Sequence, residues 1–271
     1  MVTFGPKSIY DQNRHIWNIR VRQGAAHTRT ASERDFQNPL QVVDPRGWLG
    51  KSVHGQRVLC LAAGGGLQSV LLAAAGAEVT VVDLSPAMLE QDRRMASSRG
   101  LTLRLIEGSM DNLSMLGAAC FDVVIQPVST CYVPDIVRVY KEVARVTVVS
   151  GLYLSQHKQP TSLQASASPG PQGYTIHDVY YRCEPLPPTL GEHEHRERGA
   201  LEFLHRWEQL IGGLCRSGFV IEDLQEPNYA DPMAGIGTFR HRSQFIPPYV
   251  AIKARRTHAS SDMAASPLLG P

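Results

Sequence analysis

One stretch, RVLCLAAGGGLQSVLLAAAGAEVTVVDLSP from Arg57 to Pro86, constrains the fold of this sequence more than any other. A short apolar run enters a glycine triplet, a small-residue helical pattern follows, and a second apolar run ends on Asp83. Glycines between a strand and a helix let a ligand approach the backbone, and the helix N-terminus offers free N–H groups. Asp83 follows Gly64 by 19 positions, a spacing that suits an acid accepting hydrogen bonds from an adenosine ribose. The stretch therefore predicts two strands joined through a ligand-binding turn and a helix.

Strands and helices alternate along the rest of the chain. Near-continuous apolar runs such as TVVD and DVVI are typical of parallel strands buried on both faces, and the alternation implies right-handed crossovers. The predicted fold class is α/β, a Rossmann-like doubly wound sheet that is mostly parallel with an antiparallel final strand. Strands are expected at 58–62, 78–83, 103–107, 121–126, 151–155, 219–224 and 249–253. Helices are expected at 8–35, 66–75, 86–99, 134–146 and 201–217, with Ser85 as N-cap and Gly100 as stop of the third.

Five segments follow from this reading. We expect an N-terminal helical cap or lid over 1–52, a Rossmann-like core over 53–156, an insert before the last helix over 157–200, a C-terminal part of the sheet over 201–256, and a flexible tail over 257–271. The insert is rich in proline, serine and glycine, and a loop of that length is usually functional or disordered.

Bulk composition narrows the class of protein. The chain has 271 residues with 43% apolar and 19% charged residues, which is ordinary for a globular protein. No apolar run approaches the ~20 residues that span a bilayer, and no secretory signal is evident, so we expect a cytoplasmic protein without a membrane partner. Five scattered cysteines indicate reduced thiols. A net charge of +2 makes nucleic acid an unlikely partner.

Taken alone, the glycine turn fits either a dinucleotide or S-adenosylmethionine. The dinucleotide fingerprint matches poorly, because Ser69 stands where a third glycine or alanine would allow close helix packing. Downstream residues favour the second ligand. They are EGSMDNL after the third strand, FDVVIQPVSTCYVPD at the fourth, and YKEVARV leading to GLYLS. With these segments the chain resembles class I S-adenosylmethionine-dependent methyltransferases of the small-molecule, methyltransferase domain 11 type, well over about 55–156 and more loosely over 201–256.

The resemblance implies a cofactor site, with S-adenosylhomocysteine as product. VLCLAAGGG occupies the place of the family motif VLDLGCGTG, in which Ala62 replaces the first glycine and Cys60 replaces the acid. We expect the Cys60 thiol to pack as a small hydrophobe. Asp83 matches the acid that grips the ribose, and Ser109 stands at a position where the family often has aspartate. The implied cofactor-binding residues are Tyr10, Ala62, Ala63, Gly64, Gly66, Gln68, Asp83, Leu84, Ser109, Met110, Asp111, Gln126, Pro127 and Val128.

Methyl transfer is a displacement at an activated carbon, so the enzyme chiefly aligns the reactants and excludes water. Where the acceptor must lose a proton, histidine is the natural base at neutral pH. His157, expected just after the fifth strand, and His205, expected on the helix over 201–217, are the candidate bases. Tyr10 and Trp17 lie seven residues apart on the first helix, which we interpret as a lid whose aromatic rings either approach the sulfonium or fasten the helix to the core.

The remaining sequence features leave several functions open. The run GEHEHRERG, with His193 and His195, lacks partner ligands at suitable spacing, so no metal site is expected. The leading function is methylation of a small molecule, possibly a secondary metabolite. An RNA or protein methyltransferase is the alternative, disfavoured by the near-neutral charge and by QPVST at the fourth strand. A non-catalytic S-adenosylmethionine-binding protein or a dinucleotide-binding protein is the third hypothesis.

Overall fold

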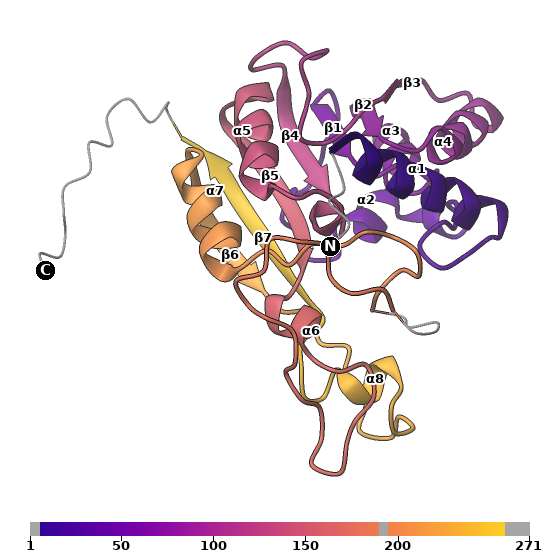
Figure 1. Cartoon of the computed structure of the whole chain (residues 1–271). Coiled ribbons are helices and arrows are strands. Elements are labelled where there is room, and N and C mark those ends of the chain that lie inside the picture. The colour runs from indigo at the N-terminus through magenta and orange to yellow at the C-terminus, as the bar shows by residue number, and fades with distance from the viewer. Residues whose placement is uncertain (1–5, 190–194, 258–271) are drawn as a thin grey trace, which may run out of the picture.

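A seven-stranded sheet forms the centre of the molecule in the computed structural model, which describes residues 6–189 and 195–257 (Figure 1). Its strands run in the order β3-β2-β1-β4-β5-β7-β6. They are β1 (Arg57–Leu61), β2 (Glu78–Asp83), β3 (Leu103–Glu107), β4 (Phe121–Gln126), β5 (Thr147–Lys158), β6 (Phe219–Gln225) and β7 (Tyr249–Arg256). The pairs among the first five strands are parallel, whereas β7 runs antiparallel to both β5 and β6. The predicted fold class is therefore confirmed.

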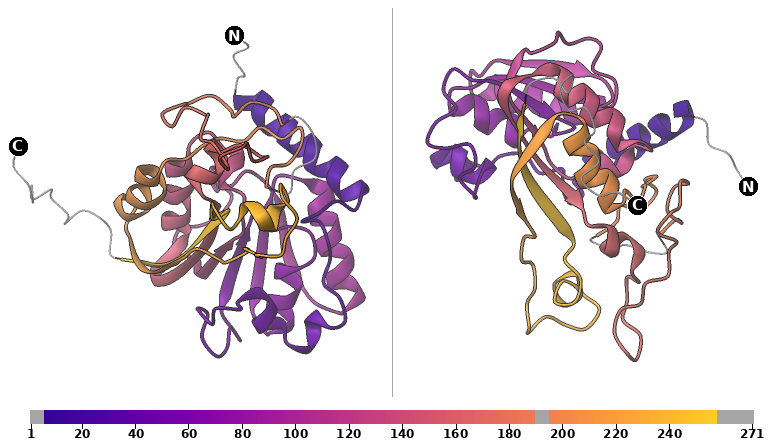
Figure 2. Two further views of the ribbon diagram at one scale, coloured as in Figure 1. Left: turned by 90° about the horizontal axis from the view of Figure 1, so that it is seen from below. Right: turned by 90° about the vertical axis from the view of Figure 1, so that its left-hand side faces the viewer.

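Helices cover both faces of this sheet (Figure 2). The side chains of Leu59 and Leu61 pack on one face, against the core formed by α5 and the helical segment before β6. Because successive residues of a strand point to opposite faces, Val58 and Cys60 pack on the other face, against α2 and α3. The helices are α1 (Pro6–Arg22), α2 (Pro39–Val43), α3 (Gln68–Ala74), α4 (Pro86–Ser98), α5 (Ile136–Val146), α6 (Pro160–Gln164), α7 (Gly213–Arg216) and α8 (Phe239–Arg242). Short turns of helix are η1 (Asp35–Gln37), η2 (Thr130–Tyr132) and the π-helical η3 (Glu208–Gly212).

The start and end of α4 agree with the sequence. The hydroxyl of Ser85 accepts a hydrogen bond from the Met88 N–H, as an N-cap does, and Gly100 follows the helix with φ +63°. Cys60 is fully buried within the apolar core, as expected of a small hydrophobe.

Two predicted helices were too long. The first ends at Arg22 instead of residue 35, because Gly24 adopts φ +59° and the chain turns back until the Ala31 N–H donates to the Gly66 carbonyl at 2.7 Å. The helix predicted over 201–217 begins only near Trp207. Residues 201–206 belong to neither a helix nor a strand, and the Phe203 N–H donates to the Cys131 carbonyl at 2.7 Å. His205 therefore lies in the segment before the helix.

The fifth strand is longer than predicted. It was expected over 151–155 but spans Thr147–Lys158, so His157 lies inside the strand and the expected boundary between core and insert at 156/157 falls within it. Of the predicted tail, residues 258–271 lie outside the described residues. Among the described helices, none is long and apolar enough to cross a membrane.

The long connection after β5 and the one between β6 and β7 fold together beyond the end of the sheet (Figure 2). The buried guanidinium of Arg242 on α8 donates to the Ser162 carbonyl at 2.7 Å and to the Ser162 hydroxyl at 2.8 Å. The rings of Tyr174 and Phe245 pack at a centroid distance of 5.6 Å. These contacts join α6 to α8, so the two connections form one unit beside the carboxyl end of β5.

The glycine turn contains a testable point of strain. Ala62 adopts φ +48°, a left-handed conformation that costs a non-glycine residue about 1 to 2 kcal/mol. We expect Ala62→Gly to raise the free energy of unfolding by roughly 0.5 to 1 kcal/mol, since relief of strain exceeds the added entropy of the unfolded chain. Denaturation in urea measures it. Ala63→Gly is the control: its φ is not positive, and it should destabilise by about 1 kcal/mol. Equal losses in both variants would contradict the strain at Ala62.

Candidate active site

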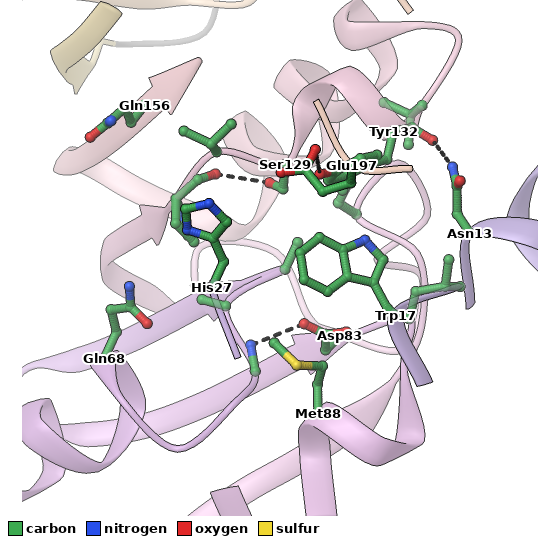
Figure 3. Close-up of a pocket in the computed structure, with 18 of the residues that line it drawn as sticks. Asn13, Trp17, His27, Gln68, Asp83, Met88, Ser129, Tyr132, Gln156 and Glu197 are labelled. Atoms are coloured by element: carbon green, nitrogen blue, oxygen red, sulfur yellow. Dashed lines mark hydrogen bonds between the residues drawn. The ribbon is translucent and has the colours of Figure 1, made fainter. Parts of the chain in front are cut away.

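A cavity of about 510 Å³ opens where the parallel strands end (Figure 3). Its wall includes a residue that ends or follows each of four neighbouring strands, namely Ala62 after β1, Asp83 at the end of β2, Gly108 after β3 and Pro127 after β4. The carboxyl edge of an open α/β sheet is where such folds bind ligands, and the volume is typical of small-molecule sites.

The glycine triplet is held by two buried carboxylates. The N–H of Gly64 donates to Asp83 at 3.0 Å, while the N–H groups of Gly65 and Gly66 donate to Asp92 on α4 at 3.1 and 2.8 Å. The Ser69 hydroxyl at the start of α3 donates to the same Asp92 carboxylate. A Cβ at Gly64 would lie only 2.9 Å from that of Met88, so the close approach requires glycine there. All three N–H groups of the triplet are thus bound within the protein.

Burial sets the charge of both acids. It raises the pKa of Asp83 to about 6 and that of Asp92 to about 6. The hydrogen bonds that the two carboxylates accept from backbone N–H groups lower these pKa values, but by less than burial raises them. The second oxygen of Asp83 accepts the Ser85 N–H at 2.8 Å, so its carboxylate has a fixed orientation at the cavity wall. Above pH 6 the floor of the cavity therefore carries negative charge.

The segment after β3 joins the cavity wall to α1. The Tyr10 hydroxyl and the Ser109 hydroxyl donate to the two oxygens of Asp111, each at 2.5 Å. Burial and the bond to Asp111 raise the pKa of Tyr10, so the phenol stays protonated. Tyr10, Ser109 and Met110 line the cavity, whereas Asp111 lies behind them as their common acceptor.

Helix α1 forms one side of the cavity, and its Asn13 and Trp17 side chains belong to the wall (Figure 3). The buried Asn13 amide donates to the carbonyls of Tyr132 at 3.0 Å and Leu201 at 3.1 Å, and its oxygen accepts the Leu201 N–H at 2.8 Å. Trp17 lines the cavity and packs edge-on against the Tyr132 ring at 5.6 Å. The tryptophan thus both faces the cavity and fastens α1 to the core.

The end of the cavity away from the glycine turn is aromatic with one acidic group. Tyr132, Tyr229 and Tyr249 form part of its wall together with Gln156 and Glu197. Glu197 accepts the Tyr132 hydroxyl at 2.7 Å and forms a buried ion pair with Lys158 at 2.6 Å. Lys158 also pairs with Glu202, which pairs with Arg196 at 2.5 Å. The charges of this buried network balance, and it connects β5 to the residues that precede η3.

Most of the predicted cofactor-binding residues lie along this cavity. They are Tyr10, Ala62, Ala63, Gly64, Gln68, Asp83, Leu84, Ser109, Met110, Pro127 and Val128. Gly66, Asp111 and Gln126 do not line it. The Gln126 amide is buried instead, donating to the Ser129 hydroxyl at 3.0 Å and accepting the Tyr153 hydroxyl at 2.5 Å. These three residues support the wall.

Neither candidate base lies along the cavity. Both ring nitrogens of the buried His157 are occupied, by the Thr130 and Ser155 hydroxyls at 2.8 Å each, and His205 donates through Nε2 to the Thr130 carbonyl at 2.9 Å. Burial lowers the pKa of His157 to about 3 and that of His205 to about 4. The two imidazoles are therefore neutral packing groups in this structure. Among the described residues, the histidine in the cavity wall is His27.

Sequence reasoning missed several residues of the site. His27 and Arg29 line the cavity from a loop that was expected to be helical. Tyr229 and Tyr249 come from distant parts of the chain, and no local pattern identifies them. Asp92 carried a signal, because it recurs with Met88 and Ala96 at helical spacing on the buried face of α4. An acid at an apolar position of a helix indicates a buried partner.

The histidine-rich run gives no metal centre in the part of the chain that is described. His193 and the glutamates beside it at 192 and 194 lie outside the described residues. Over 6–189 and 195–257, no group of three or more His, Cys, Asp or Glu side chains is arranged to hold a metal ion.

Comparison with known proteins assigns the family. The model of the family described as "Methyltransferase domain" matches residues 59–155. An uncharacterized methyltransferase of Bacillus subtilis, YbaJ, is 35% identical over 214 residues, which cover 78% of this chain and 83% of the relative. The chain therefore belongs to the methyltransferase-domain family of enzymes.

Solved structures agree on the fold. An S-adenosylmethionine-dependent methyltransferase from Mesorhizobium loti superimposes with a TM-score of 0.63 at 23% identity, covering 82% of this chain and 100% of that one. Geranyl diphosphate C-methyltransferase from Streptomyces coelicolor gives a TM-score of 0.63 at 15% identity, with 94% and 100% covered. The fold is that of S-adenosylmethionine-dependent methyltransferases.

The attachment of α1 can be tested at Asn13. Asn13→Ala leaves three backbone groups, on Tyr132 and Leu201, without their partners, so we expect a loss of about 2 to 3 kcal/mol of stability and faster amide exchange throughout α1. Hydrogen exchange with mass spectrometry measures the second effect. Gln12→Ala is the control, because it removes one exposed bond to the Gly199 carbonyl and should cost no more than about 0.5 kcal/mol. Unchanged exchange in α1 of the Asn13 variant would refute this role.

Proposed function

We propose that this methyltransferase transfers a methyl group from S-adenosylmethionine to a small-molecule acceptor by direct displacement. The observation that carries the proposal is the single cavity that runs from the glycine turn and Asp83 to the aromatic end at Tyr229 and Tyr249. One covered space with two chemically different ends suits a donor and an acceptor that must meet in line.

The residues of the first end fit the donor. The oriented carboxylate of Asp83 suits a ribose diol, and Ser109 and Met110 lie beside it where an adenine would be placed. Arg29 is the one lysine or arginine among the described residues of the wall. One of its guanidinium nitrogens is paired with Asp35 at 2.8 Å, and its other N–H groups are our candidates to hold the methionine carboxylate. Its loop is bound to the glycine turn through Ala31.

The glycine turn argues against a dinucleotide. A pyrophosphate binds such a turn through free backbone N–H groups. Here Gly64 donates to Asp83, and Gly65 and Gly66 donate to Asp92, so these N–H groups are already bound to carboxylates. The same two negative charges repel a phosphate and attract a sulfonium.

The second end suits a small and partly apolar acceptor. Trp17, Tyr132, Tyr229 and Tyr249 supply aromatic surface, and Gln156 and Glu197 supply polar groups. The similar structure from Streptomyces coelicolor is a complex with geranyl diphosphate, which is a small molecule. A diphosphate itself suits this wall poorly, because Arg29 alone supplies a strong cation among its described residues. Cover by α1 leaves little room for a folded macromolecule.

In the reaction, S-adenosylmethionine supplies an electrophilic methyl group on its sulfonium. The residues of this chain bind, orient and exclude water: Asp83 fixes the donor, and α1, fastened by Asn13, closes the cavity. Among the described residues of the wall, His27 is the one histidine, the residue type that usually acts as a base near neutral pH. If the acceptor loses a proton during methyl transfer, His27 or a water molecule would take it.

Donor binding can be tested through Asp83. We expect S-adenosylhomocysteine to bind the wild type, and Asp83→Asn to weaken it about 10- to 100-fold at pH 7.5, since hydrogen bonds to a charged group contribute about 1.5 to 3 kcal/mol. Isothermal titration calorimetry measures both. Glu90→Gln, on the exposed side of α4, is the control and should bind as the wild type does. Binding of NADH without binding of S-adenosylhomocysteine would overturn the proposal.

The raised pKa of Asp83 also predicts a pH dependence. The folded pKa of about 6 exceeds the ordinary value of 3.8, so the protonated acid is favoured in the fold and stability falls as pH rises from 4 through 6. Donor affinity changes in the opposite direction, because the ionised form accepts the ribose hydroxyls. We expect affinity for S-adenosylhomocysteine to fall up to about tenfold per pH unit below 6, and Asp83→Asn to flatten this profile. If affinity depended on pH equally in the wild type and in Asp83→Asn, a group other than Asp83 would be responsible for the titration.

The acceptor class needs a separate measurement. Incubation with methyl-labelled S-adenosylmethionine and a fractionated cell extract should place label in the low-molecular-mass fraction. Label that enters RNA or protein and is lost on nuclease or protease treatment would favour the alternative acceptors. S-adenosylhomocysteine binding with no labelled product from any fraction would favour a binding protein without activity.

A further inference from the structure

Asp92 is the buried charged group at the donor site that the proposed function does not use directly. It is fully buried on α4 and does not line the cavity. We infer that Asp92 is a positioning residue for the donor: from beneath, its carboxylate holds the glycine turn in the shape that presents Ala62, Ala63 and Gly64 to the ligand. The inference rests on the proposed function, since it concerns the same donor.

The contacts of Asp92 all serve the turn. One oxygen accepts the Gly66 N–H at 2.8 Å and the Ser69 hydroxyl, and the other accepts the Gly65 N–H at 3.1 Å. Burying a carboxylate costs several kcal/mol unless it is well hydrogen-bonded, so an apolar residue at this face of α4 would be the simpler solution for packing alone. Three donors converging on one acid indicate that the acid orders the turn.

The turn depends on this acid chiefly at Gly66. Without Asp92, the Gly66 N–H would lose its acceptor, whereas the Gly65 N–H would keep only the Met88 carbonyl at 3.1 Å, so the turn would be held on that side by a single backbone bond. Gly65 and Gly66 adopt φ +121° and +70°, which favour glycine, and glycine gives the turn many other conformations to occupy. Movement there displaces Gly64 and its bond to Asp83.

The position of Asp92 relative to β1 explains why an acid is needed on the helix. Cys60 occupies the place where the family motif, VLDLGCGTG, has its acid, on the strand that leads into the turn. Asp92 lies near enough to Cys60 that, after burial, its charge contributes to raising the pKa of the thiol. A carboxylate at residue 60 and the carboxylate of Asp92 would therefore share one buried site beside the turn, which in this chain holds the acid on α4 and the thiol on β1.

A reciprocal exchange tests the inference. Asp92→Ala should weaken S-adenosylhomocysteine binding at least about tenfold, and Cys60→Asp alone should also weaken it because two acids would share one buried site. The double variant Cys60→Asp with Asp92→Ala should restore the dissociation constant to within about threefold of the wild type. Calorimetry, done well below the unfolding temperature of each variant, measures affinity, and Glu90→Ala on the exposed side of α4 is the matched control.

The outcomes separate the possible failures. The inference is overturned if the losses of affinity in the two single variants add in the double variant. It is also overturned if Asp92→Ala binds S-adenosylhomocysteine as the wild type does while its melting temperature falls, because Asp92 would then only stabilise the fold. If Asp92→Ala does not fold, Ser69→Ala and Asp92→Asn take its place, and each should weaken binding by a smaller factor; unchanged affinity in both would also overturn it. No binding of S-adenosylhomocysteine by the wild type would instead overturn the proposed function.

Discussion

Two buried carboxylates bound to three glycine N–H groups are the interaction on which the donor site depends. Asp83 arrives from β2 and Asp92 from α4, so the turn after β1 is fixed against both neighbouring elements. The bonds satisfy backbone groups that could not otherwise be buried, and they leave negative charge beneath the cavity. The geometry of the turn and the charge preference of the site thus have a common cause.

The aromatic end of the cavity is built on a different part of the sheet. Strand β5 extends to Lys158 and pairs along its length with the antiparallel β7, which carries Tyr249 into the wall. The buried ion pairs of Lys158 with Glu197 and Glu202 then attach the residues before η3 to this ribbon. The paired strands β5 and β7 therefore connect the parallel part of the sheet to two long connections that shape the second end of the cavity.

The fold and the residues that line the cavity around the glycine turn were predictable because their signals are local. Strand patterns, the glycine triplet and Asp83 lie within short stretches whose spacing follows from one strand–turn–helix unit. The errors arose where distant contacts override local preference. The Ala31–Gly66 bond ends α1 early and brings Arg29 to the cavity, while the Phe203–Cys131 bond keeps His205 off a helix. His157 was expected just after the fifth strand, but β5 continues past it to Lys158 and both of its ring nitrogens are hydrogen-bonded inside the fold.

The fastening of α1 has a kinetic consequence. Its buried Asn13 is bound to two segments far along the chain, and Trp17 packs on Tyr132, so several contacts must break together before α1 can move away from the cavity. Where the product leaves past this helix, its release is expected to be slower than the chemical step.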